Sequence, residues 1–115
     1  MGIVRSRQTV PETEWAPEHF ACSLVEREEY SVKLERIPPG GASDLHAHRH
    51  SRQFFFVLEG EARMQVGGDV CTLGVQEGVE VAIGEPHRIE HAGGDALIFL
   101  LVSVPRIHPE DVWSK

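Results

Sequence analysis

Short apolar runs separated by turn-forming residues constrain the fold of this chain more than any other feature. Runs rich in Val, Ile, Leu and Phe alternate with breaks that contain Gly, Pro or Asp, and a spacing of about 8–12 residues between such breaks is typical of an all-β sandwich or barrel. Apolar residues at helical spacing are nearly absent. The chain is therefore predicted to be all-β. The expected strands are Phe20–Glu26, Tyr30–Ile37, Gln53–Glu59, Ala62–Val66, Val70–Leu73, Val79–Ile83, His87–His91 and Ala96–Val102.

Glycine-rich breaks predict where the chain turns. The segment Gly67-Gly68-Asp69 fits a hairpin turn, and Ala92–Asp95 fits a second one, because glycine adopts positive φ without steric cost. Pro38–Gly41 ends the strand that precedes it. The first fifteen residues and the tail after residue 105 carry no strong pattern, although Asp111–Trp113 is expected to form a short helical turn.

Chain length and charge limit the class of protein. The 115 residues match one domain of about 100–150 residues, so residues 1–115 are predicted to form a single domain. Its barrel core spans about residues 30–102, and the two terminal segments pack outside. The net charge is −7 with neutral histidines. Binding to phosphate backbones or anionic membranes needs clustered basic residues, so neither nucleic acid nor membrane is an expected partner.

The cellular compartment is predicted from where the apolar runs fall. The longest run is Ala96–Val102, far short of the roughly 18 residues that a membrane-spanning helix needs. The first fifteen residues meet charge and proline before any apolar stretch, unlike a secretory signal. We therefore expect a cytoplasmic protein in which Cys22 and Cys71 are free thiols.

Histidines concentrate in two stretches and indicate a metal site. His46 and His48 share one face if their segment is extended, so both rings can bind one ion. A third donor can arrive from the strand that begins at Gln53, and His87 can supply a fourth. The alternative for the His-Ala-His-Arg-His run is a polar surface loop with no ligand.

The spacing of these residues resembles the first motif of the cupins. That motif runs Gly, five residues, His-x-His, three or four residues, Glu, six residues, Gly. The matching positions here are Gly40, His46, His48, Gln53 and Gly60. Gln53 therefore replaces the carboxylate of the motif.

The second cupin motif is matched more loosely. It is represented by Gly78, the Gly84–His87 segment and His91, but the turn is shorter, its leading proline is absent and His91 replaces asparagine. The resemblance covers about Tyr30 to Val102. It implies a small single-domain cupin: an all-β double-stranded β-helix, or jelly-roll, barrel with its site in the open mouth.

The resemblance implies that His46, His48, Gln53 and His87 surround one divalent transition metal. The amide of Gln53 is neutral, so the site keeps a formal charge of about +2 with a divalent ion, and imidazole-rich sites suit Zn, Fe, Ni, Mn or Cu better than Mg or Ca. Phosphomannose isomerases, which are cupin-like, hold zinc with a glutamine among the ligands. The alternative for Gln53 is a polar strand residue that makes only a hydrogen bond.

Four further histidines remain beside this set. His91 shares a face with His87, so it is the tentative catalytic residue as an acid or base near neutral pH, with a buried structural histidine as the alternative. His50 either joins the site or points to solvent. His19 and His108 are expected at the surface. Arginines 49, 52, 63 and 88 could recognise an anionic group, and the sequence does not rank them.

Three classes of function stay open, because cupins include enzymes and pure binding proteins. The first is a metal-binding cupin that acts on or binds a small organic molecule, as an isomerase, decarboxylase or dioxygenase. The second is a metal-independent cupin that resembles nucleotide-sugar isomerases and epimerases. The third is a non-catalytic ligand-binding or sensing module. Whether the protein is an enzyme is not decided by its sequence.

Alternation along the strand that begins at Gln53 predicts a homodimer. If Gln53 faces the barrel interior, Phe54, Phe56 and Leu58 face outward. Large apolar side chains on an outer face need a cover. The N-terminal segment or a second copy supplies it, and a two-fold dimer that exchanges a strand near Trp15–Leu24 is the expectation.

Overall fold

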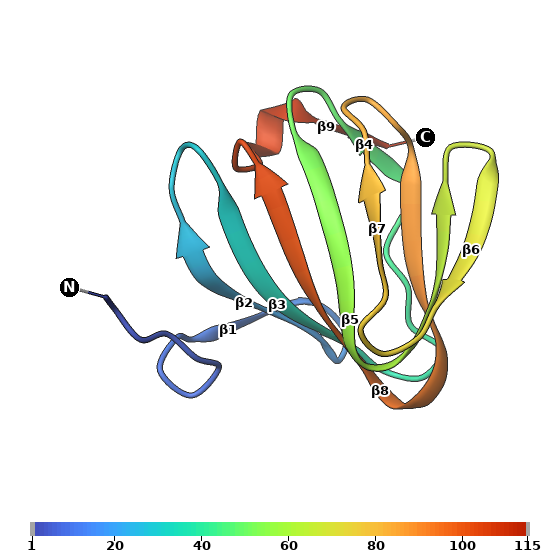
Figure 1. Cartoon of the computed structure of the whole chain (residues 1–115), viewed down its shortest axis with the longest axis horizontal. Helices are drawn as coiled ribbons and strands as arrows, with labels where there is room; N and C mark the ends of the chain where they lie inside the picture. Colours follow the sequence, from blue (N-terminus) through green and yellow to red (C-terminus); the bar gives the residue numbers. More distant parts are fainter. Residues whose placement is uncertain (1, 115) are drawn as a thin grey trace.

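The computed structural model of this chain describes residues 2–114, with side chains described as far as residue 112. Within this range the chain forms antiparallel β-strands and one short 3-10 helix, which confirms the predicted all-β class (Figure 1). The strands are β1 (Glu12–Ala16), β2 (His19–Glu26), β3 (Ser31–Ile37), β4 (His46–His48), β5 (Arg52–Val66), β6 (Asp69–Leu73), β7 (Gly78–Val81), β8 (His87–Val104) and β9 (Val112–Ser114). The 3-10 helix, Pro109–Asp111, lies between β8 and β9.

Two long strands, β5 and β8, connect the two halves of the barrel. The first part of β5 pairs with the last part of β8, and this half continues through β3, β2 and β1 on one side and β7 on the other. In the other half, the last part of β5 pairs with the first part of β8. Here β6 pairs with β5, β4 pairs with β8, and β9 pairs with β4. The strands curve around a common interior (Figure 1). This arrangement is the predicted double-stranded β-helix barrel.

The sequence predicted one break between Glu59 and Ala62 and another between His91 and Ala96. Both predictions are wrong, because β5 and β8 run through these positions. The two long strands shift register against each other between Val57 and Ala62. Gly60 has φ of 80°, and a side chain there would collide with the backbone of Ala96. Gly94 also has positive φ, at 85°. These glycines let two paired strands bend together, so Ala92–Asp95 forms no hairpin turn.

Two other predicted turns are confirmed by the structure. The pair Val66 and Asp69 closes the hairpin between β5 and β6, and the amide of Gly41 donates to the carbonyl of Pro38 at 2.9 Å. The 3-10 turn is at Pro109–Asp111, before the predicted helical turn, and Val112–Ser114 is instead the strand β9 beside β4. The N-terminal region, expected to be unpatterned, contains β1, which pairs with β2.

The core fills the interior between the two halves. Its fully buried members include Val57, Met64, Leu97 and Phe99. They come from the inward faces of β5 and β8, as alternation in strands requires. Cys22 and Cys71 are free thiols, as expected. Within residues 2–114, no helix is long and apolar enough to cross a membrane.

Candidate metal and ligand site

Three histidines meet where β4 lies beside the start of β8. His46 and His48 project from β4 with Ala47 between them, and His46 pairs across the sheet with His87. The ring centroids are 4.5 Å apart for His46 and His87, 5.0 Å for His46 and His48, and 5.3 Å for His48 and His87. One nitrogen from each ring lies within 4.8 Å of the others. The three rings could therefore hold one metal ion.

Backbone contacts fix which ring nitrogen is available. The Nδ1 atoms of His46 and His87 lie 2.7 Å and 3.0 Å from the carbonyl oxygens of Asp44 and Glu85. A carbonyl only accepts, so each Nδ1 carries the proton and each Nε2 keeps a free lone pair. The Nε2 of His87 and both ring nitrogens of His48 are buried without a hydrogen-bond partner.

Burial keeps two of these rings neutral. It lowers the pKa of His48 to about 4, and repulsion from His46, His87 and Lys33 adds to the effect. Burial also lowers the pKa of His87 to about 4, although the backbone contact to Glu85 opposes this shift. Neutral imidazole is the form that binds metals. His48 and His87 are therefore in the metal-binding form at neutral pH.

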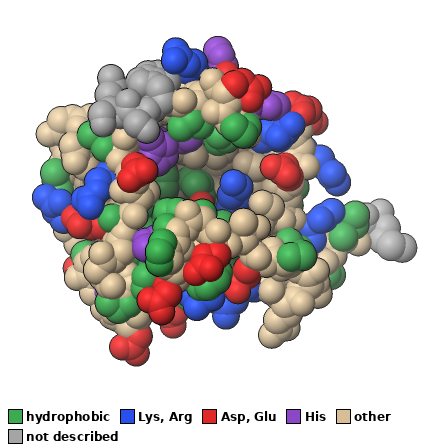
Figure 2. All heavy atoms as spheres, turned by 180° about the vertical axis from the view of Figure 1, so that it is seen from behind, with side chains coloured by type: hydrophobic (Ala, Val, Ile, Leu, Met, Phe, Trp, Pro, Cys, Tyr) green, Lys and Arg blue, Asp and Glu red, His purple; other side chains and the backbone are tan. Residues whose placement is uncertain are grey.

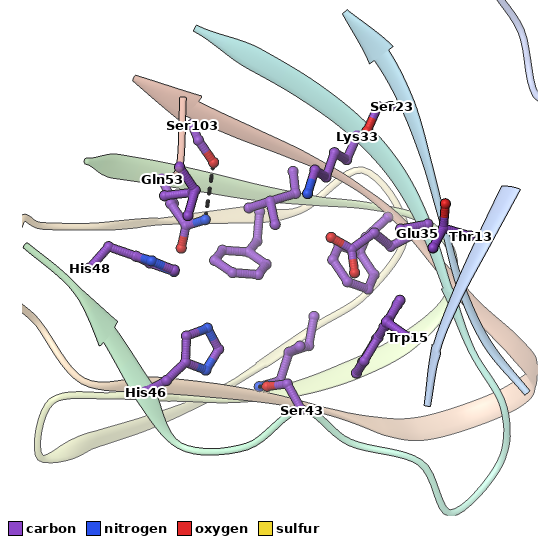
Figure 3. A pocket seen from close by; sticks show the side chains of 16 residues that line it. Thr13, Trp15, Ser23, Lys33, Glu35, Ser43, His46, His48, Gln53 and Ser103 are labelled. Carbon is purple, nitrogen blue, oxygen red and sulfur yellow. Dashed lines mark hydrogen bonds between the residues drawn. The ribbon is translucent and has the colours of Figure 1, made fainter. Parts of the chain in front are cut away.

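Gln53 presents its amide oxygen beside these histidines. The side chain is 3% exposed, and its Nε2 donates a hydrogen bond to the hydroxyl of Ser103 at 3.0 Å. Its Oε1 is buried and has no hydrogen-bond partner. Figure 3 shows Gln53 on the same side of the cavity as His48. A buried amide oxygen without a partner, on the side of the cavity that holds His48, fits a candidate fourth metal ligand.

His46, His48 and Gln53 line one end of a cavity of about 380 Å³, whereas His87 is not part of the lining. Its walls combine apolar side chains with hydroxyl groups, and Figure 2 shows a hollow with hydrophobic and histidine side chains inside. Pockets for small organic ligands have this mixed character and about this size or larger. The other lining residues are Thr13, Trp15, Ala21, Ser23, Lys33, Glu35, Ser43, Phe55, Ile89, Phe99, Leu101, Ser103 and Ile107.

Lys33 and Glu35 are charged members of this lining that sequence reasoning missed. Both project inward from β3, because they pair with the inward-facing Leu101 and Phe99 of β8. Burial raises the pKa of Glu35 to about 7, an effect that the ammonium group of Lys33 partly offsets. Alternation of polar and apolar residues along β3 was the available signal, but such a polar face is ordinarily assigned to solvent.

The remaining histidines lie outside the cavity wall. His91 faces inward on β8, opposite Ala62, and its Nε2 is buried without a partner, but it is not part of the lining. Its catalytic role stays a prediction to which this position adds no support. His50 is exposed beside Asp111. His108 pairs with Glu28 at 3.3 Å and is partly buried.

The expectation that His19 lies at the surface is wrong. His19 is 8% exposed, and its ring lies against Trp15 with the centroids 4.6 Å apart. Gly41 makes room for it, since a Cβ at that position would be 2.6 Å from the His19 Nε2. Gly41 therefore leaves the space that the His19 ring occupies, because a side chain at position 41 would collide with that ring.

The arginines do not reach the cavity. Arg63 and Arg88 both pair with Glu90, at 2.8 Å and 3.5 Å. Arg52 is exposed at the start of β5. Among the described lysines and arginines, Lys33 alone lines the cavity.

Comparison with known proteins identifies the family. Residues 33–103 match the family described as Cupin domain. This match covers more than half of the chain, so the chain belongs to the cupins. The barrel fold and the three histidines of the first and second motifs agree with that membership.

More specific similarities are partial in sequence or restricted to fold. The chain is 32% identical over 66 residues to the mannose-1-phosphate guanylyltransferase ManC of Salmonella typhimurium, and the match spans 57% of this chain but only 14% of that protein. The structure of KdgF from Halomonas sp. has a TM-score of 0.80 at 16% identity, over 89% of this chain and 94% of that one. An oxalate decarboxylase from Lactobacillus farciminis, in a formate complex, has a TM-score of 0.78 at 20% identity, over 93% of this chain and 34% of that one.

Proposed function

We propose that this protein is a metal-dependent cupin that binds, and acts on, a small organic molecule in its cavity. The observation that carries the proposal is the cluster of His46, His48 and His87, whose ligand atoms lie within 4.8 Å of one another. Two of the three, His46 and His48, line the cavity. Buried nitrogens without partners are costly in a folded protein. A metal ion would satisfy these atoms.

The proposed ligands are the three imidazoles and the Oε1 of Gln53. Two of the imidazoles are oriented by hydrogen bonds to backbone carbonyls, and Gln53 is oriented by Ser103. Contacts of this kind hold metal ligands in place and select their tautomer. A neutral set of nitrogen and amide ligands favours a divalent transition metal such as Zn, Fe, Ni, Mn or Cu.

The chain's own residues would provide the rest of the site. A bound metal would supply Lewis-acid activation of an oxygen atom on the ligand. Phe55, Phe99 and Leu101 line the cavity with apolar surface and would exclude water from the bound molecule. Hydroxyl groups from Ser23 and Ser43 line the same space and can hydrogen-bond a polar ligand.

Elemental analysis of purified protein tests the proposal. We expect about one transition-metal ion per chain, and we expect the His46→Ala and His87→Ala chains to be purified without it. The exposed histidine in His50→Ala serves as a matched control that keeps its metal. Metal-free wild-type protein that also fails to take up Zn²⁺, Fe²⁺, Ni²⁺, Mn²⁺ or Cu²⁺ would contradict the proposal.

A metal-independent isomerase related to nucleotide-sugar enzymes is the second candidate. The chain has only one Tyr and two Trp with which to stack a base, but β1 places Trp15 in the cavity wall with Phe55 and Phe99. Aromatic walls can stack a base or a sugar. Retained activity after complete metal removal would favour this candidate. A non-catalytic module would bind a ligand and leave it chemically unchanged.

A further inference from the structure

We infer that Lys33 and Glu35 form a second anchor of the ligand site, and that the ligand is a small hydroxy acid or oxo acid. Its carboxylate would face Lys33, and its hydroxyl or carbonyl oxygen would reach Glu35. The inference rests on the proposed function only in taking the cavity as the ligand site.

The two side chains come from the same inward face of β3. Lys33 pairs with Leu101 and Glu35 with Phe99, and all four line the cavity. In Figure 3 the Lys33 ammonium lies along the wall between the His48–Gln53 group and Glu35, which is near Trp15 and Thr13. A ligand that lies along this wall would contact the metal end, then Lys33, then Glu35.

The two groups influence each other electrostatically, but neither has a direct bonding partner among the described residues. Lys33 and Glu35 form no hydrogen bond or close ion pair with another residue in the described part of the chain. Enclosing a charged group without a partner costs free energy, so a pair of such groups in a cavity indicates a binding role. A ligand carrying one anionic and one neutral polar group would satisfy both.

The charges select the chemical class. Among the described residues that line the cavity, Lys33 is the cation and Glu35 is the carboxylate. A single ammonium matches one carboxylate, whereas a phosphate group brings more charge and more acceptors than one lysine can satisfy. Burial raises the pKa of Glu35, which favours its protonated form and lets it donate a hydrogen bond to a ligand oxygen.

Apolar walls and size restrict the ligand further. The cavity of about 380 Å³ is near the lower end of the range for small-molecule pockets, about 300–1,000 Å³. Phe55, Phe99 and Leu101 contribute apolar surface next to the two charged groups. A short carbon chain that ends in a hydroxy or oxo carboxylate fits this combination.

Calorimetry with a panel of simple acids tests the inference. The probes are lactate and its longer-chain homologues, the matching acids without the hydroxyl group, and lactamide as the neutral counterpart. We expect metal-loaded wild-type protein to prefer a hydroxy acid over both kinds of control. Lys33→Met should weaken acid binding about tenfold or more, the usual effect of losing a charged hydrogen bond. Lys33→Gln repeats the comparison if the methionine chain fails to fold.

Two matched surface variants separate local effects from changes in net charge. Arg52→Met removes one positive charge outside the cavity, and Glu80→Ala removes one exposed carboxylate from β7. We expect both to bind the acids as wild type does. Glu35→Ala should lose the preference for the hydroxy acid over its matching acid, and Glu80→Ala should keep it.

The outcomes distinguish this inference from the proposed function. If wild-type protein binds metal but binds no acid of the panel, or if Lys33→Met and Arg52→Met bind acids equally, the inference fails and the metal site stands. If the protein binds no metal, the proposed function fails. The inference is then tested on metal-free protein: it fails if Lys33→Met and Arg52→Met bind the acids equally, and it stands if Lys33→Met binds them more weakly.

Discussion

Gln53 donates its Nε2 hydrogen to the hydroxyl of Ser103 at 3.0 Å, and this bond leaves the amide oxygen buried and unpaired. The two residues are neighbours across β5 and β8, where Gln53 pairs with Ser103 in the register. The serine therefore determines which end of the amide faces the histidines. An amide presented in the opposite sense would place its NH2 group toward a cation, which no metal site tolerates.

The first prediction concerns this orientation. Ser103→Ala frees the amide of Gln53 to rotate, so metal affinity should fall, by about tenfold as is typical when a contact behind a metal ligand is lost. Ser23→Ala is the matched control, because Ser23 lines the same cavity and forms no hydrogen bond with Gln53. Competition with a fluorescent chelator measures both chains. Equal affinities would show that Ser103 does not position a ligand.

The second prediction is a pH dependence of the metal-free protein. The pKa values of His48 and His87 are lowered to about 4 in the fold and are about 6.5 in an unfolded chain. Between these values the unfolded chain binds more protons, so stability falls as pH falls from 6.5 to 4, on the order of 2 kcal/mol for each ring.

Metal should enlarge that loss, because protons compete with the ion for the same nitrogens. The stabilisation that metal adds should therefore shrink as pH falls below 6.5. Thermal unfolding with and without chelator measures it, in a Glu35→Gln background that removes the opposing titration of Glu35. A metal-induced stabilisation that stays constant down to pH 5 would mean that the histidines are not ligands.

The third prediction isolates Glu35. Its pKa is raised to about 7 in the fold, above its value of about 4.3 when unfolded. The folded protein therefore binds more protons than the unfolded chain between these values, and Glu35 reduces stability as pH rises through this range. Glu35→Gln should stabilise metal-free protein by about 1–3 kcal/mol at pH 8 and not at pH 4. Denaturant unfolding measures it, with exposed Glu80→Gln as the control expected to change nothing. A gain equal at both pH values would show that the pKa of Glu35 does not differ between the folded and unfolded chain.

The fourth prediction is the homodimer. Phe54 and Leu58 face outward and are each 40% exposed, and the ring of Phe54 stacks on that of Phe56 with the centroids 6.0 Å apart. The N-terminal segment does not cover them, because β1 pairs with β2, on the far side of β3 and β8 from β5. We propose that a second copy of the chain covers this face.

Light scattering measures the assembly. Wild-type protein should have twice the chain mass of 12.8 kDa, and Phe54→Asp with Leu58→Asp should have the mass of one chain. Val75→Asp places an acid at another exposed apolar residue and should leave the dimer intact. Wild-type protein of single-chain mass at micromolar concentration would contradict the proposal.

The spacing of apolar runs and of the motif histidines in the sequence was sufficient to predict the fold and the histidine cluster. His46 and His48 are two residues apart in an extended segment, which determines their common face, and the motif spacing brings His87 to them. The continuity of β5 and β8 was not predictable in this way, because glycines ordinarily end strands. Gly60 and Gly94 here bend two strands that stay paired.

Lys33 and Glu35 escaped prediction for a different physical reason. Along β3 the apolar residues Val32 and Leu34 pair with Val102 and Leu100 on the outward face, while Lys33 and Glu35 face the cavity. This reverses the usual assignment of polar residues to solvent. Only the register with β8 shows which side of the strand is inside.

Calorimetric titration of Zn²⁺ into metal-free protein tests the central claim most directly. We predict one ion per wild-type chain, tighter binding for Gln53→Glu, which adds a negative charge to the ligand set, and weaker binding for Gln53→Ala. The chains His46→Ala and His87→Ala should bind weakest, since each loses a nitrogen donor whose orientation the backbone fixes. Five chains with equal affinity, or no binding by the wild-type chain, would contradict the assignment of these residues as a metal site.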